Sequence, residues 1–399
     1  MSGRRLRVVC GWLALPMLFA LPTVNASATD PVAVALSYEQ TEDRANFINR
    51  VRKARQGDTE SQWQVGSTYA KLGHPERALP MLRSAAEAGH PRAAALLGWL
   101  HENGRGTEKS IEEARRWYRS AAEQGQADAM AALGRLLLRD SAERDAARLM
   151  LQKAAQLDDP NGQYYLGWLL AQSSGDAFAD AQAYALFSKA ASQGHVGAQV
   201  AAATHLLTGR GVAIDRKAAR EWLERAAEKQ DPVAHYLLGR ISEGAGQTSL
   251  DKAQSSFRVA AIFGHREAQF ALANLLASSV ALADRKEAAE WFAKAREAGH
   301  KAAANRLGEL YRDGAGDLQQ VDRARSIFRQ AAEQGDADAM YNLAHLQNQG
   351  LGGPRDTGKA LEWYVRAAEA GHEKASAVVA RLLDSSVKAS DLGLKGFWQ

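Results

Sequence analysis

One short sequence pattern recurs along most of this chain and limits what it can fold into. The pattern A-A-x-x-G appears nine times at intervals of 33 to 36 residues. The nine copies begin at Ala85, Ala121, Ala154, Ala190, Ala226, Ala260, Ala295, Ala331 and Ala367. A repeat of this length is one supersecondary element that buries its apolar face only by stacking on its neighbours. The 399 residues therefore predict a single repeat array rather than two or three globular domains.

Two further patterns predict that each repeat is a pair of helices, here called A and B. Helix A carries the pattern L-G-x-L, as at residues 97–100, and helix B carries the anchor A-A-x-x-G. A large apolar residue such as Trp117 lies four residues before most anchors, on the same helical face, with Ser256 as the exception. A glycine inside a helix costs roughly 1 kcal/mol relative to Ala. We therefore expect the helix A glycine to admit a close approach of helix B, with the large residue filling the remaining gap.

Glycines between the helices predict where the helices end. The loop from A to B contains G-x-G in five repeats, where positive φ angles at glycine can end helix A. The five pairs are Gly104/Gly106, Gly209/Gly211, Gly244/Gly246, Gly314/Gly316 and Gly350/Gly352. Asp215 and Asp322 follow two of these loops and are expected to cap helix B. The anchor itself is imperfect in three copies, because Asp158 and Gln230 replace its glycine and Arg296 replaces its second alanine.

Together these patterns resemble the Sel-like repeat (SLR), a relative of the tetratricopeptide repeat. Residues 359–364, with the sequence K-A-L-E-W-Y, lie close to the family consensus. The resemblance covers residues 57–385, more than four-fifths of the chain. It implies an all-α fold, a right-handed α-solenoid of about nine stacked helix-turn-helix repeats that serves as a protein-interaction scaffold. Residues 29–56 are then an N-terminal extension with a capping helix, and residues 386–399 are a tail that either caps the last helix or docks into a partner.

Residues 1–28 indicate a secretory signal peptide. Three arginines precede an apolar stretch at residues 8–21, and A-S-A at residues 26–28 supplies an A-x-A cleavage site. We expect cleavage after Ala28, with cleavage two residues earlier as the alternative. The apolar stretch is too short to span a bilayer permanently, and the only cysteine, Cys10, lies at the wrong end of it for a lipoprotein anchor. The mature protein is therefore expected in the periplasm or outside the cell, without a disulfide.

Charge and motif content argue against several function classes. The formal net charge is +4, but the three arginines of the signal segment account for most of it, leaving 47 basic against 46 acidic residues. Mixed charges give no basic field for nucleic acid, and no later stretch is apolar enough for an integral membrane span. Residues 353–360 nearly match a phosphate-binding loop, yet a helical pattern precedes them and Ala360 supplies no hydroxyl. We expect no enzyme activity, cofactor or metal.

Histidines follow the anchor glycine in five repeats and need a separate explanation. They are His90, His195, His265, His300 and His372. A metal site would need their nitrogens about 2 Å from one ion. Equivalent positions in successive repeats should instead lie about 10 Å apart, given the usual distances between packed helices. We therefore predict that these histidines are structural residues of the turns between repeats.

The repeats align with one another, so variable positions can be distinguished from framework positions. In tetratricopeptide-like solenoids helix A lines the concave side, and the x of L-G-x-L varies freely. The candidate partner-binding residues at this position are Trp99, Arg135, Trp168, Arg240, Glu309 and His345. The position one turn earlier adds Tyr164, Tyr236 and Tyr341. Aromatic and Arg side chains are favoured in binding hot spots, whereas aromatics at helical spacing are also typical of packing between repeats, and both interpretations of the tyrosines stay open.

The sequence thus predicts a non-catalytic periplasmic or secreted scaffold that binds partner proteins on its concave face, in a cell-envelope or secretion assembly. Two alternatives stay open. One is a secreted effector that binds host proteins. The other is a protein that binds cell-wall or exopolysaccharide glycan by stacking sugars on the aromatic residues of the groove.

Overall fold

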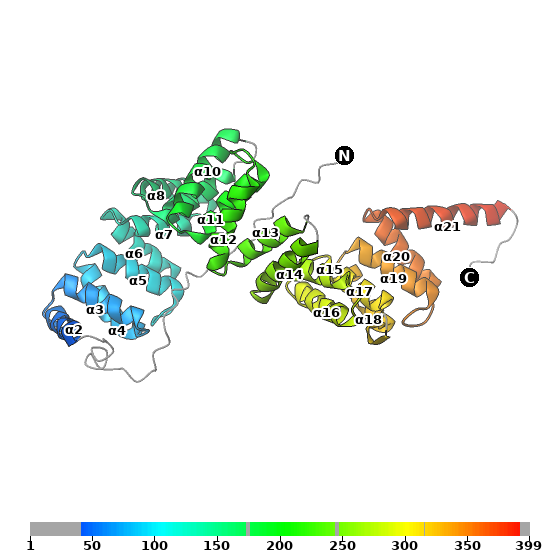
Figure 1. The fold of residues 1–399 in the computed structure, drawn as a ribbon, viewed down its shortest axis with the longest axis horizontal. Coiled ribbons are helices and arrows are strands. Elements are labelled where there is room, and N and C mark those ends of the chain that lie inside the picture. The colour runs from blue at the N-terminus through cyan, green and yellow to red at the C-terminus, as the bar shows by residue number, and fades with distance from the viewer. Residues whose placement is uncertain (1–40, 173–175, 244–246, 315, 392–399) are drawn as a thin grey trace. The chain divides into compact units, whose positions relative to one another are not determined.

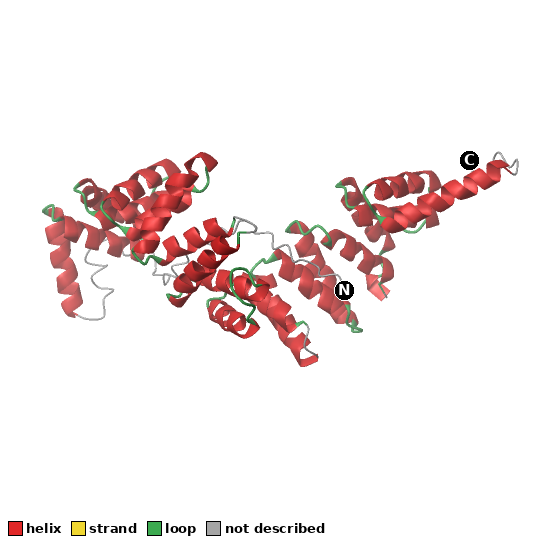
Figure 2. Cartoon of the chain, turned by 90° about the horizontal axis from the view of Figure 1, so that it is seen from above, coloured by secondary structure: helices red, strands yellow, loops and turns green. Residues whose placement is uncertain are grey.

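The computed structural model describes residues 41–172, 176–243, 247–314 and 316–391. Twenty α-helices and two short 3₁₀ turns occur in these residues, with no strand among them (Figure 2). The predicted all-α solenoid fold is therefore confirmed. None of the helices in this part of the chain combines the length and the apolarity that a bilayer crossing requires. The predicted signal peptide at residues 1–28 and the last eight residues of the predicted tail lie outside the described residues.

The chain divides into two compact units, the first of which ends at His195 (Figure 1). Helix α2 precedes the first repeat, and from α3 onward odd-numbered helices are A helices and even-numbered helices are B helices. The bounds in the first unit are α2 Thr41–Arg55, α3 Thr59–Lys71, α4 Pro75–Glu87, α5 Pro91–Asn103, α6 Ile111–Glu123, α7 Ala127–Leu137, α8 Arg144–Gln156, α9 Pro160–Ala171 and α10 Ala177–Ser192. Helix α2 places Phe47 and Val51 in the apolar core of this unit, where the Phe47 ring contacts the edge of Tyr69.

The second unit begins at Val196 and continues the same alternation of helices. Its bounds are α11 Val196–Thr208, α12 Arg216–Glu228, α13 Pro232–Ser242, α14 Gln247–Ile262, α15 Arg266–Ala277, α16 Leu282–Glu297, α17 Ala303–Asp313, α18 Val321–Glu333, α19 Ala337–Gln349, α20 Thr357–Glu369 and α21 Glu373–Asp391. In both units an A helix packs chiefly against the B helix that follows it, and the buried apolar residues lie between them. Residues 386–391 of the predicted tail continue α21.

The helix A glycines let the paired helices approach closely, as predicted. A Cβ atom added at Gly98 would lie 2.8 Å from the Tyr118 ring, and one added at Gly239 would lie 2.5 Å from the Phe257 ring. Equivalent contacts join Gly66 to Leu82, Gly134 to Leu151, Gly167 to Phe187 and Gly308 to Phe328. These distances leave no room for a carbon atom, so glycine at this position sets the distance between the two helices.

The side chain that fills the gap is one residue later than predicted. The sequence favoured the residue four before each anchor, such as Trp117, but the glycine contacts the residue three before it, such as Tyr118. This position carries Leu, Phe or Tyr in all nine repeats and is almost fully buried in each. Ser256 is then no exception, because Phe257 holds the buried position. Adjacent residues lie about 100° apart around a helix, so only one of two large neighbours can face the glycine.

The tryptophans four residues before the anchors contact a cation instead of the helix A glycine. Each lies under a cation on its own B helix. The cation lies three residues later in Trp222/Arg225, Trp291/Lys294 and Trp363/Arg366, with distances of 4.8, 4.0 and 4.2 Å to the ring centroids. Such cation–π pairs contribute about 0.5–1 kcal/mol at exposed sites. These tryptophans thus support the B helix rather than the contact with glycine.

We expect Gly239→Ala to destabilise the chain although Ala is the better helix former. The intrinsic gain of about 1 kcal/mol is opposed by overpacking against the fully buried Phe257, which costs about 1–3 kcal/mol. Gly358→Ala is the matched control, because the nearest atom to its added Cβ lies at 3.7 Å, and this variant should be as stable as the parent or slightly more so. Urea unfolding followed by circular dichroism measures both, and equal midpoints would contradict the close approach.

A residue with positive φ closes the turn after each B helix. Seven of these nine positions are glycine, with φ between 80° and 94°, namely Gly89, Gly125, Gly194, Gly264, Gly299, Gly335 and Gly371. Asp158 and Gln230, which replace the anchor glycine, occupy the other two positions, with φ of 64° and 59°. They are the only non-glycine residues with positive φ among the described residues. The left-handed conformation costs an ordinary L-residue about 1–2 kcal/mol. The array therefore tolerates strain at two turns to preserve the repeat geometry.

We expect Gln230→Gly to stabilise the chain by about 0.5–1 kcal/mol, since the relieved strain exceeds the added freedom of the unfolded chain. Gly264→Ala is the reciprocal change, and nothing lies within 4 Å of its added Cβ, so backbone strain alone should destabilise it by about 1 kcal/mol. Thermal and urea unfolding compare the two with the parent. A Gln230→Gly variant less stable than the parent would show that φ does not decide this position.

The loops between A and B helices agree with the sequence in part. Positive φ occurs at Gly104/Gly106, Gly209/Gly211 and Gly350/Gly352, as predicted. The prediction is wrong for Gly314, which is extended at φ −65°, and the pair at residues 244 and 246 lies outside the described residues. Asp215 caps α12 by accepting hydrogen bonds from two backbone N–H groups at 3.0 and 2.9 Å. Asp322 does not cap α18, because that helix begins one residue earlier and the residue preceding it is Gln320.

Candidate functional site

The A helices place the candidate residues of the first unit at equivalent positions. Trp99, Arg135 and Trp168 lie on α5, α7 and α9, which are successive A helices. Trp168 is 38% exposed. The Arg105 guanidinium lies over the Trp99 ring, 5.7 Å from its centroid. The three positions therefore present an aromatic ring, a cation and a second aromatic ring on consecutive repeats.

Arg135 is held by an ion pair that links two repeats. Its Nη2 donates to both carboxylate oxygens of Glu102, at 2.6 and 2.7 Å, and the Tyr118 hydroxyl donates to the same carboxylate at 3.1 Å. Burial lowers the pKa of Arg135, but the ion pair with Glu102 raises it by more, so the pKa stands above its ordinary value. Tyr118 is also the ring that packs on Gly98. This predicted surface residue is thus part of the structural framework as well.

In the second unit, Arg240 and Glu309 lie on α13 and α17, and each forms an ion pair with a residue three positions away along the chain. The Nε of Arg240 lies 2.9 Å from Glu243, and the Arg240 side chain is 48% exposed. Glu309 accepts from Arg306 at 2.8 Å. Of the residues predicted at the x position, Glu309 and His345 approach the same recess.

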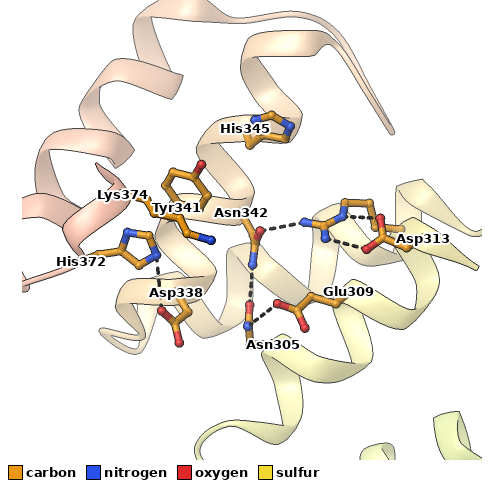
Figure 3. Close-up of a pocket in the computed structure, with 10 residues that line it drawn as sticks. Asn305, Glu309, Asp313, Asp338, Tyr341, Asn342, His345, His372 and Lys374 are labelled. Carbon is orange, nitrogen blue, oxygen red and sulfur yellow. Dashed lines mark hydrogen bonds and ion pairs between the residues drawn. The ribbon is translucent and has the colours of Figure 1, made fainter. Parts of the chain in front are cut away.

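That recess is an open hollow with a volume of about 530 Å³ (Figure 3). It is formed by α17, α19 and the start of α21, all in the second unit. Its walls are Asn305, Glu309, Arg312, Asp313, Asp338, Tyr341, Asn342, His345, His372 and Lys374. Three of these, Glu309, Tyr341 and His345, were predicted as partner-binding residues. The recess thus gathers three predicted residues from two repeats.

A chain of hydrogen bonds forms one side of the recess. Arg312 donates through Nη1 to the side-chain Oδ1 of Asn342 at 2.8 Å, and the side-chain Nδ2 of Asn342 donates to Oδ1 of Asn305 at 2.8 Å. The Asn305 amide in turn donates to Glu309 at 3.1 Å (Figure 3). Both asparagines are buried, at 7% exposure. A buried network whose members are bonded to each other is rigid, so this side of the recess is already formed without a partner.

The remaining groups of the recess carry charges of both signs. The guanidinium of Arg312 also donates to both oxygens of Asp313 at 2.7 Å, and these bonds hold the pKa of that carboxyl below its usual value. Asp338 and Lys374 are exposed, and Asp338 lies 3.4 Å from the outer nitrogen of His372. Among the described residues no cluster of His, Cys, Asp and Glu is placed to hold a metal ion. The recess suits a polar segment that offers both donors and acceptors.

The three predicted tyrosines stack on histidines of the turns between repeats. Tyr164 stacks on His195 at 4.5 Å between ring centroids, Tyr236 on His265 at 4.6 Å and Tyr341 on His372 at 4.5 Å. The planes of each pair lie within 27° of parallel. The structure therefore shows these tyrosines packing between repeats, which is one of the two interpretations of them. Tyr341 also lines the recess, so contact with a partner stays a prediction for it.

The aromatic position one turn before the x of L-G-x-L and the position after the anchor glycine vary together from repeat to repeat. An aromatic in helix A is followed by a histidine in the next turn at Trp63/His90, Tyr164/His195, Tyr236/His265, Phe270/His300 and Tyr341/His372. We call these five pairs the aromatic–histidine junctions. Repeats without the aromatic have Gln or Asp instead, at Ala95/Gln126, Ala131/Asp159, Val200/Asp231 and Asn305/Asp336. The correlation can be read from the sequence once the two columns are compared repeat by repeat.

We expect Asn342→Ala to destabilise the chain by about 1–3 kcal/mol, because it leaves the buried Asn305 carbonyl oxygen without its donor. Asn274→Ala is the matched control. Asn274 also accepts a hydrogen bond from an arginine of the next repeat, at 3.2 Å, but that bond is exposed, so the cost should stay near 0.5 kcal/mol or below. Urea unfolding of both variants measures the difference. Similar losses for the two would mean that burial of the network adds no stability.

Comparison with known proteins identifies the family. The Sel1 repeat model matches residues 91–126, 127–159, 160–195, 196–231, 266–300, 301–336 and 337–372, which together make up more than half of the chain. The chain therefore belongs to the Sel1 repeat family. Sel1 repeat proteins are generally protein-interaction scaffolds, and the solenoid family is generally non-catalytic.

Individual relatives are similar over different lengths. An uncharacterized protein of Neisseria meningitidis serogroup B is 29% identical over 256 residues, or 64% of this chain, and the match spans about half (53%) of that relative. Among solved structures, the uropathogenic Escherichia coli protein c5321, described as a protective antigen displaying an SLR fold, matches with a TM-score of 0.66 and 27% identity, over 88% of this chain and 78% of that one. A Sel1 repeat protein of Oxalobacter formigenes is also 27% identical, over 91% of this chain and 98% of that one, with a TM-score of 0.39.

Proposed function

We propose that this chain is an exported, non-catalytic scaffold that holds a partner protein on the surface formed by its A helices. The observation that carries the proposal is the recess of α17, α19 and α21, whose hydrogen-bonded wall is formed before any partner arrives. A pre-organised site loses little side-chain freedom on binding, which favours affinity. Membership of a family of interaction scaffolds supports the same conclusion.

The chemistry of the x position favours a protein over a polymeric glycan as the partner. From one A helix to the next this position changes between aromatic, cationic, anionic and imidazole side chains. A glycan built from one repeating sugar would offer the same group at each step, whereas a folded or extended protein offers different groups. Alternating character along the surface therefore suits a protein partner.

Export is supported by the basic residues, the apolar stretch and the A-x-A site of residues 1–28. A periplasmic or secreted location follows from such a segment, and we place the scaffold in a cell-envelope or secretion assembly. Similarity to c5321, described as a protective antigen of uropathogenic strains, favours one second candidate, a secreted protein that contacts the host. Fractionation separates the two, because the second candidate accumulates in the culture medium and the first in the periplasm.

We expect a photoreactive amino acid at position 345, in the recess, to crosslink the partner in the producing bacterium. The matched control is the same amino acid at position 361, since Leu361 is 43% exposed on the B helix α20. Mass spectrometry of the crosslinked species should find a protein with position 345 and none, or a different one, with position 361. Identical crosslinks from both positions would remove the A-helix surface as the binding face, and crosslinks to murein fragments alone would favour the glycan alternative.

A further inference from the structure

In three of the five aromatic–histidine junctions the imidazole caps the following helix. In the junction Tyr236/His265, the Nδ1 of His265 accepts a hydrogen bond from the backbone N–H of Ala268 at 3.2 Å and so caps α15. His90 and His372 cap α5 and α21 in the same way, at 3.2 and 3.0 Å. A nitrogen that accepts a hydrogen bond carries no proton. The cap therefore requires a neutral ring with its proton on Nε2.

Protonation conflicts with this arrangement at two points. A second N–H on the imidazole would face the backbone N–H that it now accepts from, so the helix would lose its cap. The charged ring would also stay in a site with little access to water, because the His265 side chain is only 13% exposed and its face is covered by Tyr236. At the next junction only the second point applies, because His300 does not cap α17. His300 stacks on Phe270 at 3.9 Å, and its Nδ1 is buried without a hydrogen-bond partner in the described part of the chain. Its turn is joined to the start of α17 by the hydrogen bond from the Ala303 N–H to the His300 backbone carbonyl oxygen at 3.1 Å.

We propose that the aromatic–histidine junctions make the repeat stack sensitive to mild acid: protonation of His265 and His300 releases the starts of α15 and α17, while repeats that begin with an aspartate cap stay closed. This device is independent of which partner the A helices hold. It requires only that the histidines be neutral in the packed stack and charged once the turn is released.

The charged groups around these two histidines come from α15 and from the preceding A helix. Glu267 lies 3.8 Å from His265 and Arg266 lies beside it, and the same two residues face His300. Arg240 on α13 and Glu243, directly after the end of α13, act on Tyr236, which covers His265. Burial lowers the pKa of both histidines, and the opposing effect of Glu267 is smaller.

The direction of the pH effect follows from the lowered pKa. Between the ordinary histidine pKa of 6.5 and the lower value in the folded chain, the unfolded chain binds a proton that the folded chain does not. These junctions therefore contribute their full share of the free energy of unfolding above about pH 6.5. This contribution falls as the pH drops from 6.5 towards the lowered histidine pKa of the folded chain. At a third junction of the same type, burial lowers the pKa of His195 to about 4. The pH window of that junction therefore reaches from about 6.5 down to about 4.

Aspartate caps respond with the opposite sign. Asp231 and Asp336 accept from the backbone N–H groups of Ala234 and Ala339, each at 2.8 Å. Burial raises the pKa of both carboxyls, so in these groups the folded chain takes up a proton before the unfolded chain does. Mild acid therefore does not destabilise the starts of α13 and α19 through these groups.

Two of the histidine junctions have a carboxylate opposite the outer nitrogen. Glu60 lies 3.0 Å from the Nε2 of His90, and Asp338 lies 3.4 Å from the Nε2 of His372. Each carboxylate would pair with the charged imidazole. The starts of α5 and α21 are therefore not part of the proposed device.

Hydrogen exchange of the full chain at pH 7.5 and pH 5.0, corrected for intrinsic exchange rates, tests the device. The first turns of α15 and α17 should lose protection by about tenfold or more at pH 5.0, because the released turns no longer hold the helix starts. The first turns of α13 and α19 should change by less than about threefold. Parallel loss of protection in all four helices, or no loss in any, overturns the proposal.

Two variants separate titration from simple disruption. Tyr236→Val combined with His265→Asp copies the Val200/Asp231 junction of the same unit, and His265→Asn keeps an N-cap that does not titrate. Both should abolish the pH-dependent loss at the start of α15. His345→Asn, a histidine of the same unit outside the junctions, should retain it. If His265→Asn, folded at pH 7.5, still loses protection at α15 on acidification to the parent's extent, the histidine is not the sensor.

Discussion

The contact between a glycine of helix A and a large side chain of helix B sets the geometry of six of the nine repeats, and alanine takes the glycine position in the other three, at Ala203, Ala273 and Ala344. Gly98 against Tyr118 and Gly239 against Phe257 leave no space for even one carbon atom. This contact fixes how far apart the two helices lie, and the apolar core between them follows from it. Because the inner faces of both helices are used in this way, we propose the remaining face of helix A as the binding surface.

Much of the fold could be predicted from the sequence because the nine repeats supply their own alignment. The helix pairs and the close approach at glycine follow from positions compared across copies, whereas the positive φ angles at Asp158 and Gln230 were found only in the structure. The filler of the gap could not be predicted, since Trp117 and Tyr118 are both large and apolar. Only the packed structure shows which of two adjacent residues, about 100° apart around the helix, faces the glycine.

The candidate site was harder to predict because its contacts join residues from different repeats. Arg135 belongs to a variable column, yet its partner Glu102 lies 33 residues earlier in the chain. The bond between Asn305 and Asn342 spans 37 residues. A variable position therefore indicates freedom from the common framework, but a pair of such positions can still form a local framework. The aromatic–histidine junctions are the exception, since both partners occupy fixed columns and vary together.

The central claim is that packing at the glycine contact specifies the fold and leaves the x position of L-G-x-L free for binding. Protease resistance measured for substitutions at every position of the full chain tests it most directly. The account predicts loss of resistance at the helix A glycines and at the residues three before each anchor, repeated along the chain, with tolerance at Trp99, Trp168, Arg240 and His345. Equal tolerance at the glycine column and at these four positions would contradict it.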